Sequence, residues 1–461
     1  MQLDFNDISE KRLHHIFDLI RDGKNICLLG PGGTGKSYII KEIYNKLTEA
    51  GKNVAKTSTT GISAISINGC TLHRWAGCGL MEGEVDQIYD KFLRYNIKTR
   101  ERWTTTDLLI IDEISMLGLE TFEKFDAIAR KVTRKDKSFG GIKLLVIGDF
   151  LQLPPVKDRF VFESELWHTY EFSYIKFIHG FRYDDPEYYN MLMRIRICEH
   201  TKEDLKFIKN RHKLYESILN ATSDASGSGG IDNKYYTYMY STNRQADAHN
   251  IKELDKIKKT EHEYIARDRF NPTEEFKKSG GKFTSQDFET HAKLMDNAIP
   301  KKIILKRGAL VMLRYNVDVE SGLANGTQAH VRKCIHYEKS DDEFPQTDKV
   351  RIRLIENGES TWIEPVKFEL QIPNKGTFTR TQIPLIVAFA ATIHKFQGAT
   401  LTNAIIDLGK SVFECSQAYV ALSRTRNPNN LYLSNWDSSS IKVNPIAVSF
   451  DNEVDKIAVK L

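Results

Sequence analysis

A glycine-rich run of eight residues constrains the fold of this chain more than any other feature. The run reads Gly30-Pro31-Gly32-Gly33-Thr34-Gly35-Lys36-Ser37. An apolar stretch at residues 25–29 precedes it, and the next residues carry an apolar helical face made of Ile39, Ile40, Ile43 and Leu47. We therefore expect a strand, a tight turn and a helix in direct succession, which is typical of an α/β fold.

Three more apolar stretches occur in the first third of the chain, at residues 53–57, 108–111 and 144–147. Helical stretches separate them from one another. Short strands that are apolar along nearly their whole length are buried on both faces of a sheet. The four stretches together therefore predict a parallel sheet.

The spacing of the glycine-rich run is that of a phosphate-binding loop, G-x-x-x-x-G-K-[ST]. Glycines let the backbone wrap closely around phosphates, and the N-terminus of the next helix adds a favourable dipole. We expect Lys36 to reach the β- and γ-phosphates of ATP and the Ser37 hydroxyl to hold Mg²⁺. The predicted ATP-binding residues of the loop are Gly30, Gly32, Gly33, Thr34, Gly35, Lys36 and Ser37.

Two acidic residues, Asp112 and Glu113, follow the third apolar stretch directly. The carboxyl ends of parallel strands form the edge at which open α/β sheets bind ligands. Asp112 is therefore the expected holder of Mg²⁺, and Glu113 is the expected general base that activates water. Together with the loop, these acids predict hydrolysis of ATP rather than binding alone.

Gln152 lies in the polar turn after the fourth stretch, which spans residues 148–155 and ends in two prolines. An amide at this position could sense the γ-phosphate and orient the attacking water. A polar turn stiffened by prolines explains the same residues equally well. Both interpretations of Gln152 stay open at this point.

The later part of the chain carries a second set of α/β signals. Residues 172–178, 235–240 and 385–391 have the pattern of strands, and residues 186–198 have that of a helix. Short alternating runs between residues 303 and 369 predict small antiparallel strands. Because these runs interrupt the second α/β set, we interpret them as an inserted β domain.

Composition narrows the possibilities only slightly. The net charge of +5 is compatible with a nucleic-acid partner but is not evidence for one. No apolar run of 18 or more residues predicts a membrane-spanning helix, and the first residues lack the pattern of a signal or transit peptide. The six cysteines have no zinc-binding spacing, which favours free thiols in a reducing, intracellular compartment.

Six further motifs, in order, give the chain a specific resemblance to superfamily 1B DNA helicases of the petite-integration-frequency type, relatives of the RecD-like enzymes. The resemblance extends over residues 23–431. Besides the phosphate loop, the motifs are residues 71–77 (TLHRWAG), 112–116 (DEISM), 122–130 (FEKFDAIAR), 148–155 (GDFLQLPP), 392–398 (TIHKFQG) and 419–424 (YVALSR).

The resemblance implies two RecA-like P-loop domains with ATP bound between them, a small wedge insert in the first domain and an SH3-like β insert in the second. It implies ATP-dependent unwinding of duplex DNA with 5′-to-3′ movement along a single strand. The implied domains are residues 1–165 (with the wedge at 77–103), residues 166–250 plus 378–440, the SH3-like insert at 251–377, and a C-terminal tail at 441–461.

The resemblance also implies how the ATP site is completed. Arg182 and Arg424 would arrive from the second domain and stabilise the charge of the transition state. Gln397 and Gly398 would contribute to nucleotide binding. The expected catalytic residues are Lys36, Glu113, Gln152, Arg182 and Arg424.

Positions that match DNA contacts of the family are Thr59, Thr60, His73, Trp75, Pro154, His394 and Lys395. Hydroxyl and backbone N–H groups hold phosphates without reading sequence, and Trp75 or Phe396 could stack bases. For Trp75 we favour the alternative of an aromatic side chain in the core. The wedge is basic, which fits a duplex junction or a solvated face, because it contains Lys91, Arg94, Lys98, Arg100 and Arg102.

The expected partners are single-stranded DNA and duplex junctions, including forks and G-quadruplexes, during replication, repair or recombination. We expect a monomeric motor that acts in the nucleus or cytoplasm. Two alternatives remain, an ATPase switch or kinase without translocation and a motor that acts on RNA or without strand separation. The chain also departs from the family pattern, since Tyr183 replaces a usual glutamine and only Gln2, too far upstream, could replace the adenine-recognising glutamine.

Overall fold

The chain forms two compact units in a computed structural model. Unit 1 contains Met1–Ile231, Met239–Ser241 and Thr392–Leu461, and unit 2 contains Asp232–Tyr238 and Thr242–Ala391. The structure describes residues 5–461 except 80, 82, 96, 225–235, 279, 297–298, 316, 319–320, 322, 324–326, 337–347, 356, 373–374, 399 and 402. The Gly/Ser-rich stretch of the sequence, residues 225–230, lies outside the described residues.

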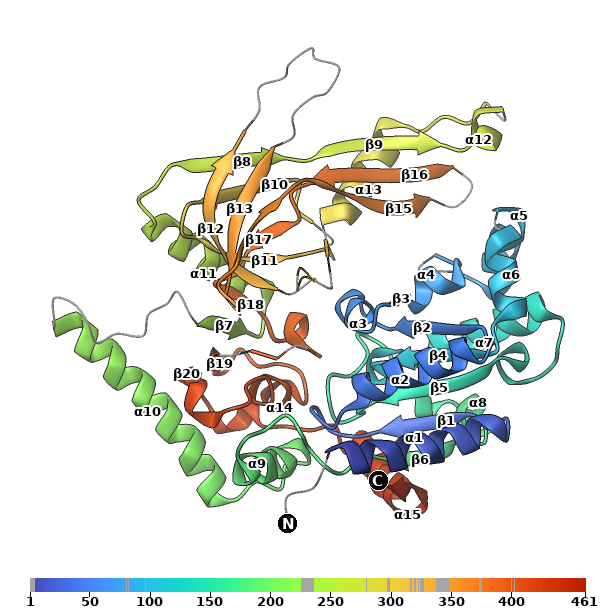
Figure 1. Cartoon of the computed structure of the whole chain (residues 1–461), viewed down its shortest axis with the longest axis horizontal. Helices are drawn as coiled ribbons and strands as arrows, with labels where there is room; N and C mark the ends of the chain where they lie inside the picture. The colour runs from blue at the N-terminus through green and yellow to red at the C-terminus, as the bar shows by residue number, and fades with distance from the viewer. Residues whose placement is uncertain are drawn as a thin grey trace. The chain divides into compact units, whose positions relative to one another are not determined.

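Unit 1 begins with a helix, which the predicted succession of strand, turn and helix follows, and further strands and helices come after it (Figure 1). Its early elements are α1 (Phe5–Arg21), β1 (Ile26–Leu29), α2 (Lys36–Glu49), β2 (Val54–Ser58), α3 (Gly61–Ser66), β3 (Cys70–Thr71), α4 (Leu72–Ala76), α5 (Val85–Tyr95), α6 (Ile97–Thr105), β4 (Leu108–Asp112), α7 (Leu119–Thr133), β5 (Lys143–Gly148), α8 (Glu165–His168) and β6 (Ser173–Lys176). Its later elements are α9 (Pro186–Arg196), α10 (Lys202–Asp224), β19 (Ala404–Leu408), α14 (Gln417–Leu422), β20 (Leu431–Trp436), α15 (Pro445–Ile457) and β21 (Val459–Lys460).

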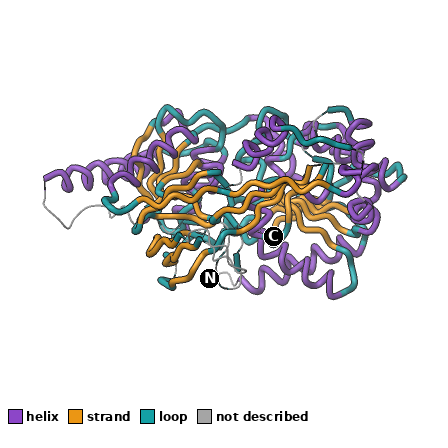
Figure 2. The backbone as a smooth tube through the Cα atoms, turned by 90° about the horizontal axis from the view of Figure 1, so that it is seen from above, coloured by secondary structure: helices purple, strands orange, loops and turns teal. Residues whose placement is uncertain are grey.

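The four apolar stretches of the sequence form β1, β2, β4 and β5 of a parallel seven-stranded sheet, as predicted. The strand order is β21-β6-β1-β5-β4-β2-β3. Alternate residues of each strand face opposite sides, and helices cover both sides (Figure 2). Ile26 and Leu28 pack with α1 and α2, whereas Cys27 and Leu29 join the core beneath α7. This double burial explains why the strands are apolar along their whole length.

Two segments lie in a different place from the one that the sequence predicted. Residues 172–178 do form a strand, β6, but it pairs with β1 in the first sheet rather than starting a second one. Residues 441–461, expected to be a tail, form α15 and β21, and β21 pairs with β6 at the edge of that sheet. The first α/β layer therefore uses residues on both sides of the predicted boundary at 165 and at the far end of the chain.

The predicted wedge consists of α5 and α6, which pack on α7 through aromatic side chains. Trp103 of α6 is fully buried, its ring centroid lies 4.6 Å from that of Trp75, and its Nε1 donates a hydrogen bond to the Ala76 carbonyl. Arg100 is exposed and Arg102 is half-buried. The side chains of Lys91, Arg94 and Lys98 lie outside the described residues.

A second parallel pair of strands, β19 and β20, belongs to the later part of unit 1. The helix α14 ends at Leu422 and is followed by Ser423 and Arg424, and Tyr188 of α9 donates a hydrogen bond to the Leu422 carbonyl at 2.6 Å. The strands β7 (Thr237–Tyr240) and β18 (Ala390–Thr392) lie where the chain passes between the units.

Unit 2 is mainly antiparallel, as the short alternating runs predicted. A five-stranded sheet has the order β14-β13-β12-β11-β17, and a three-stranded sheet has the order β15-β16-β9. The stretch 385–391 contains two short strands instead of one, Leu385–Val387 and the start of Ala390–Thr392, and the first of them pairs with β11 in this unit. The elements are α11 (Asn243–Lys256), β8 (Glu261–Ile265), β9 (Arg267–Pro272), α12 (Glu274–Lys278), α13 (Ser285–Asp296), β10 (Lys302–Lys306), β11 (Leu310–Leu313), β12 (Gln328–Ile335), β13 (Lys349–Leu354), β14 (Ser360–Ile363), β15 (Val366–Ile372), β16 (Gly376–Gln382) and β17 (Leu385–Val387).

Within the described residues, the structure has no helix that is both long enough and apolar enough to cross a membrane. All six cysteines have free thiols, and only Cys198 among them is exposed.

We predict that Trp103→Ala lowers the free energy of unfolding of unit 1 by about 3–5 kcal/mol, because the substitution removes a fully buried ring and leaves a cavity. Urea unfolding followed by circular dichroism measures this loss. Trp362→Ala is the control, since that ring is 37% exposed on β14, and it should cost no more than about 1 kcal/mol. Equal losses would contradict the core role of Trp103.

Candidate active site

The phosphate loop leaves β1 at the carboxyl edge of the sheet and is fixed to the neighbouring strand. The Gly30 amide donates a hydrogen bond to the Gly148 carbonyl at the end of β5, at 3.1 Å. Gly33 and Gly35 have φ angles of +86° and +90°, a region that side-chain-bearing residues rarely adopt. The glycines therefore permit the turn that starts α2 directly at Lys36.

Lys36 lies folded back over its own loop. Its Nζ donates to the Gly30 carbonyl at 2.7 Å and to the Pro31 carbonyl at 2.9 Å. Burial lowers the pKa of Lys36, and the carboxylates of Asp149, Glu113 and Asp112 oppose that shift. The ammonium group is thus held by neutral carbonyls, with three carboxylates nearby. A polyphosphate would be a stronger hydrogen-bond partner than those carbonyls.

The two acids Asp112 and Glu113 lie side by side where β4 ends. Burial, together with the neighbouring Glu113, raises the pKa of Asp112 to about 7. Glu113 has a left-handed backbone conformation, φ +53°, and its carbonyl accepts a hydrogen bond from the Thr59 hydroxyl at 2.8 Å. This strained turn directs the pair to the same sheet edge as the phosphate loop.

Gln397 connects Glu113 to the later motifs of unit 1. Its Nε2 donates to the Glu113 carboxylate at 3.1 Å, and its buried Oε1 has no hydrogen-bond partner among the residues that the structure describes. A Cβ atom on Gly398 would lie 3.5 Å from the same carboxylate. The segment predicted to contribute to nucleotide binding therefore lies directly on the predicted general base.

Two arginines from the later part of unit 1 meet the phosphate loop at Gly32. A Cβ atom on Gly32 would lie 3.3 Å from Nη2 of Arg424 and 3.7 Å from Nη1 of Arg182. Arg424 is 1% exposed, and its guanidinium donates to the Val420 and Phe396 carbonyls and to the Ser423 hydroxyl. Burial and the nearby Arg182 cation lower the pKa of Arg424 to about 10. Two cations held this close, near neutral partners, form a site suited to a multiply charged anion.

Two tyrosines also hold Gly32. The Gly32 amide donates to the Tyr419 hydroxyl at 3.2 Å, and the Tyr183 hydroxyl donates to the Gly32 carbonyl at 3.4 Å. The same hydroxyl hydrogen is shared with the Ser423 carbonyl, which lies 3.2 Å from the Tyr183 oxygen. The departure from the usual glutamine thus adds a contact between the loop and the residue before Arg424.

A buried ionic network holds the turn that contains Gln152. Nη2 of Arg196 lies 2.6 Å from the Asp149 carboxylate and 3.3 Å from that of Asp451, which also pairs with Lys176 at 2.9 Å. Gln152 donates to Asp149 at 3.4 Å. The network joins the end of β5, α9, β6 and α15. Sequence analysis missed Arg196, although a charged residue on the apolar face of α9 was a usable signal.

Arg12 on α1 is a second residue that sequence analysis missed. It is 1% exposed, its guanidinium carbon lies 3.8 Å from the centre of the Phe177 ring, and its Nη1 donates to the Thr34 carbonyl at 2.8 Å. Its Nη2 donates to the Leu461 carbonyl at 3.0 Å. Arg12 therefore fastens the back of the phosphate loop to the first and last elements of the sheet layer.

The residues predicted to contact DNA have different surroundings. Thr59, Thr60, His73, Pro154, His394 and Lys395 are all partly exposed. Burial lowers the pKa of His394, whose ring is parallel to the 60% exposed ring of Phe413 with 6.5 Å between centroids. Trp75 and Phe396 are 3% and 2% exposed, so neither ring is available to stack a base. The core alternative for Trp75 agrees with this burial.

Asp112 and Ser37 supply the kind of atoms that Mg²⁺ prefers. Both offer oxygen, and a carboxyl whose pKa is raised by burial gains from a nearby cation. In the part of the chain that the structure describes, no group of three or more His, Cys, Asp or Glu side chains is arranged to hold a metal ion. A site with few protein ligands fits Mg²⁺ that is shared with substrate phosphates.

Comparison with known proteins adds three findings. The family model for the PIF1-like helicase matches residues 8–191. The ATP-dependent DNA helicase PIF1 of Xenopus laevis is 31% identical over 446 residues, which are 96% of this chain and 64% of the relative. The chain therefore spans less than two thirds of the length of this relative.

Solved structures agree with the fold. The crystal structure of Pif1 helicase from Candida albicans matches with a TM-score of 0.80 and 28% identity, over 98% of this chain and all of that one. A Bacteroides Pif1 helicase in complex with ADP-AlF3 and ssDNA matches with a TM-score of 0.68 and 24% identity, over 96% and 97%. The expected fold class is confirmed, with two parallel RecA-like sheets and antiparallel insert sheets.

We predict that Asp451→Asn lowers the free energy of unfolding by about 3 kcal/mol at pH 7, because it leaves Lys176 and Arg196 with one buried carboxylate fewer. Burial alone would raise the pKa of Asp451, but Arg196 and Lys176 outweigh it and hold that pKa below its usual value. The stabilisation is therefore complete above the unfolded pKa of about 4 and is lost as the pH falls through the folded pKa.

Urea unfolding midpoints between pH 3 and pH 7 measure this dependence. The difference between wild type and Asp451→Asn should shrink as the pH is lowered. Asp455→Asn is the matched control, since Asp455 also pairs with Lys176 but is 40% exposed, and its effect should be small. A difference for Asp451→Asn that stays constant down to pH 3 would contradict the ionic role.

Proposed function

We propose that this chain is a member of the PIF1-like helicase family and an ATP-dependent DNA helicase that moves 5′-to-3′ along single-stranded DNA and separates duplex strands. One observation carries the proposal. Arg424, which lies between β19 and β20 of the second sheet, meets the phosphate loop of the first sheet at Gly32 beside Arg182, so the site contains groups that flank both RecA-like sheets. A nucleotide bound there touches both sheets, and its hydrolysis changes how they are held together.

In this proposal the loop from Gly30 to Ser37 binds the phosphates of ATP, and Lys36 exchanges its carbonyl partners for the β- and γ-phosphates. Glu113 acts as general base on the attacking water, with Gln397 holding its carboxylate. Gln152 lies within the same turn as Asp149 and orients the water. Arg182 and Arg424 stabilise the negative charge that develops on the γ-phosphate.

Ser37 and Asp112 would hold Mg²⁺. When bound, the ion supplies positive charge beside the phosphate oxygens. Asp112 would then be fully ionised, because a cation nearby opposes the burial that raises its pKa.

The Tyr419 hydroxyl accepts a hydrogen bond from the Gly32 amide, and that amide is one of the donors that bound phosphates require. We expect nucleotide binding to replace this contact. Tyr419 lies on α14, and Arg424 is the second residue after the end of that helix. Losing the Tyr419–Gly32 contact and forming a contact between Arg424 and the phosphates therefore moves both side chains together. Phosphate binding at the loop would in this way change the position of residues that flank the second sheet.

Single-stranded DNA and duplex junctions are the proposed partners. Thr59, Thr60, His73, Pro154, His394 and Lys395 form the proposed strand path, whereas Trp75 stays in the core. The α5–α6 segment supplies the proposed junction contact through its basic residues. The proposed motor is monomeric, and its six free thiols support a reducing intracellular compartment, nucleus or cytoplasm.

We predict that Arg424→Ala retains ATP binding but loses at least about a hundredfold in single-strand-stimulated turnover, since the arginine stabilises charge mainly in the transition state. Binding of a fluorescent ATP analogue and steady-state hydrolysis measure the two quantities separately. Arg211→Ala is the control, because its guanidinium bonds Asn429 away from the loop. Loss of binding without loss of turnover would refute the transition-state role.

Strand displacement is the direct test of the proposed function. With ATP, the wild type should separate duplexes that carry a 5′ single-stranded tail and leave 3′-tailed duplexes intact. Lys36→Ala should be inactive on both, because the phosphates lose their cationic partner. Unwinding only from 3′ tails would overturn the proposed polarity. Hydrolysis stimulated by RNA but not by DNA would show that RNA is the strand on which the motor acts.

A further inference from the structure

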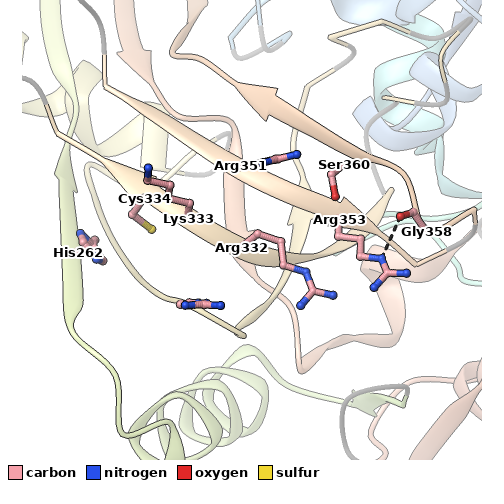
Figure 3. Close-up of a pocket in the computed structure, with 9 residues that line it drawn as sticks. His262, Arg332, Lys333, Cys334, Arg351, Arg353, Gly358 and Ser360 are labelled. Carbon is pink, nitrogen blue, oxygen red and sulfur yellow. Dashed lines mark hydrogen bonds between the residues drawn. The ribbon is translucent and has the colours of Figure 1, made fainter.

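Five cationic side chains gather on one surface of unit 2. We call this surface the basic face, and it consists of Arg307, Arg332, Lys333, Arg351 and Arg353. These side chains line a pocket of about 730 Å³ together with His262, Cys334, Gly358 and Ser360. Figure 3 shows the side chains of Arg332 and Arg353 extending from neighbouring strands toward the same side. All five cations are exposed.

A β-bulge in β12 creates part of this surface. Val331 faces Ile352 of β13 and Lys333 faces Arg351, so Arg332 is an extra residue without a partner in the ladder. Val331 and Ile352 are fully buried. Strict alternation would turn Lys333 to the buried side, but the bulge brings Arg332 and Lys333 to the outer side together. The local backbone thus concentrates charge instead of distributing it.

No acid neutralises the basic face within the described residues. None of its five side chains has a carboxylate oxygen within 4.0 Å there, although Arg353 donates to the Gly358 carbonyl at 2.9 Å. Neighbouring cations of unit 2 are paired, since Lys302 lies 2.5 Å from Glu263 and Lys306 lies 3.0 Å from Glu261. Five like charges on adjacent positions repel one another, and an external anion relieves that repulsion.

His262 is the one ring-bearing residue among the described residues that line this pocket, and the nearby Trp362, which is 37% exposed, has a cation beside its ring. Trp362 faces Arg351 across the β13–β14 ladder, and the ammonium of Lys349 lies 5.2 Å from its ring centre. The His262 ring is stacked with His336, with 5.4 Å between centroids. A single strand is gripped by stacking its bases on open rings, whereas a duplex offers only phosphates outside its grooves. The surface therefore fits the backbone of a duplex better than that of a single strand.

We propose that the basic face of unit 2 binds the phosphate backbone of duplex DNA, as a contact separate from the strand path of unit 1. The inference rests on the proposed function, because it supplies the duplex on which the motor acts. Binding would be independent of sequence and strongly dependent on salt, since each neutralised phosphate releases counterions.

The test compares two variants of the full chain with equal changes in charge. The first replaces three residues of the basic face, Arg332→Gln, Lys333→Gln and Arg351→Gln, and keeps Arg353 because of its bond to Gly358. The control replaces three exposed lysines elsewhere in unit 2, Lys282→Gln, Lys293→Gln and Lys367→Gln. Fluorescence anisotropy measures binding of a blunt 20-base-pair DNA duplex and of a 20-nucleotide single strand over a salt series.

We expect the first variant to bind the duplex at least about tenfold more weakly and to lower the slope of log Kd against log salt by about 2–3. The control should lose much less of the slope, and single-strand binding should stay within about twofold of wild type for both. Single-strand-stimulated hydrolysis that is unchanged in both variants shows that the motor is intact.

Three results would overturn the proposal. The first is duplex binding by the basic-face variant that equals that of the control. The second is an equal loss of single-strand binding, which would make the face a single-strand site. The third is displacement of the duplex from the wild type by micromolar inorganic tripolyphosphate, which would assign the face to a free polyphosphate. A wild type without single-strand-stimulated hydrolysis would instead refute the proposed function, and duplex binding would still be measurable.

Discussion

The buried ion pair between Asp149 and Arg196 supports most of what surrounds the nucleotide site. It joins the last residues of β5 to α9, and through Asp451 it reaches α15. Gln152 is held by the same carboxylate. A buried pair of this kind contributes little net stability, but losing one partner is costly, so it fixes a single geometry. The turn after β5 therefore has a defined position before any ligand arrives.

Around that fixed turn, the contacts at the phosphate loop are exchangeable. Lys36 bonds to two carbonyls of its own loop, and the Gly32 amide bonds to Tyr419. Each of these bonds uses a group that a phosphate would use more strongly. The rigid part and the exchangeable part lie within one unit, which is the arrangement expected where ligand binding must shift a population between two states.

Local sequence signals predicted the strands, the loop and the acids well. Continuous apolar runs and the spacing of the glycines are both patterns within a few consecutive residues. Sheet membership was less accessible, and β6 was assigned to the wrong sheet, since a short apolar strand carries no mark of its partner. Arg12 and Arg196 were missed for a related reason. Their roles depend on contacts with residues 22 and 47 positions away or more, which no local pattern encodes.

The edge strand β21 makes closure of the first sheet layer depend on long-range contacts. Val459 and Lys460 pair with β6, and the Leu461 carbonyl bonds to Arg12, which also bonds to the phosphate loop. Arg12 and Leu461 are 449 positions apart, so the layer closes only when a contact of very high sequence separation forms. Until then, the β6 edge and the back of the loop stay open to chaperones or to other strands.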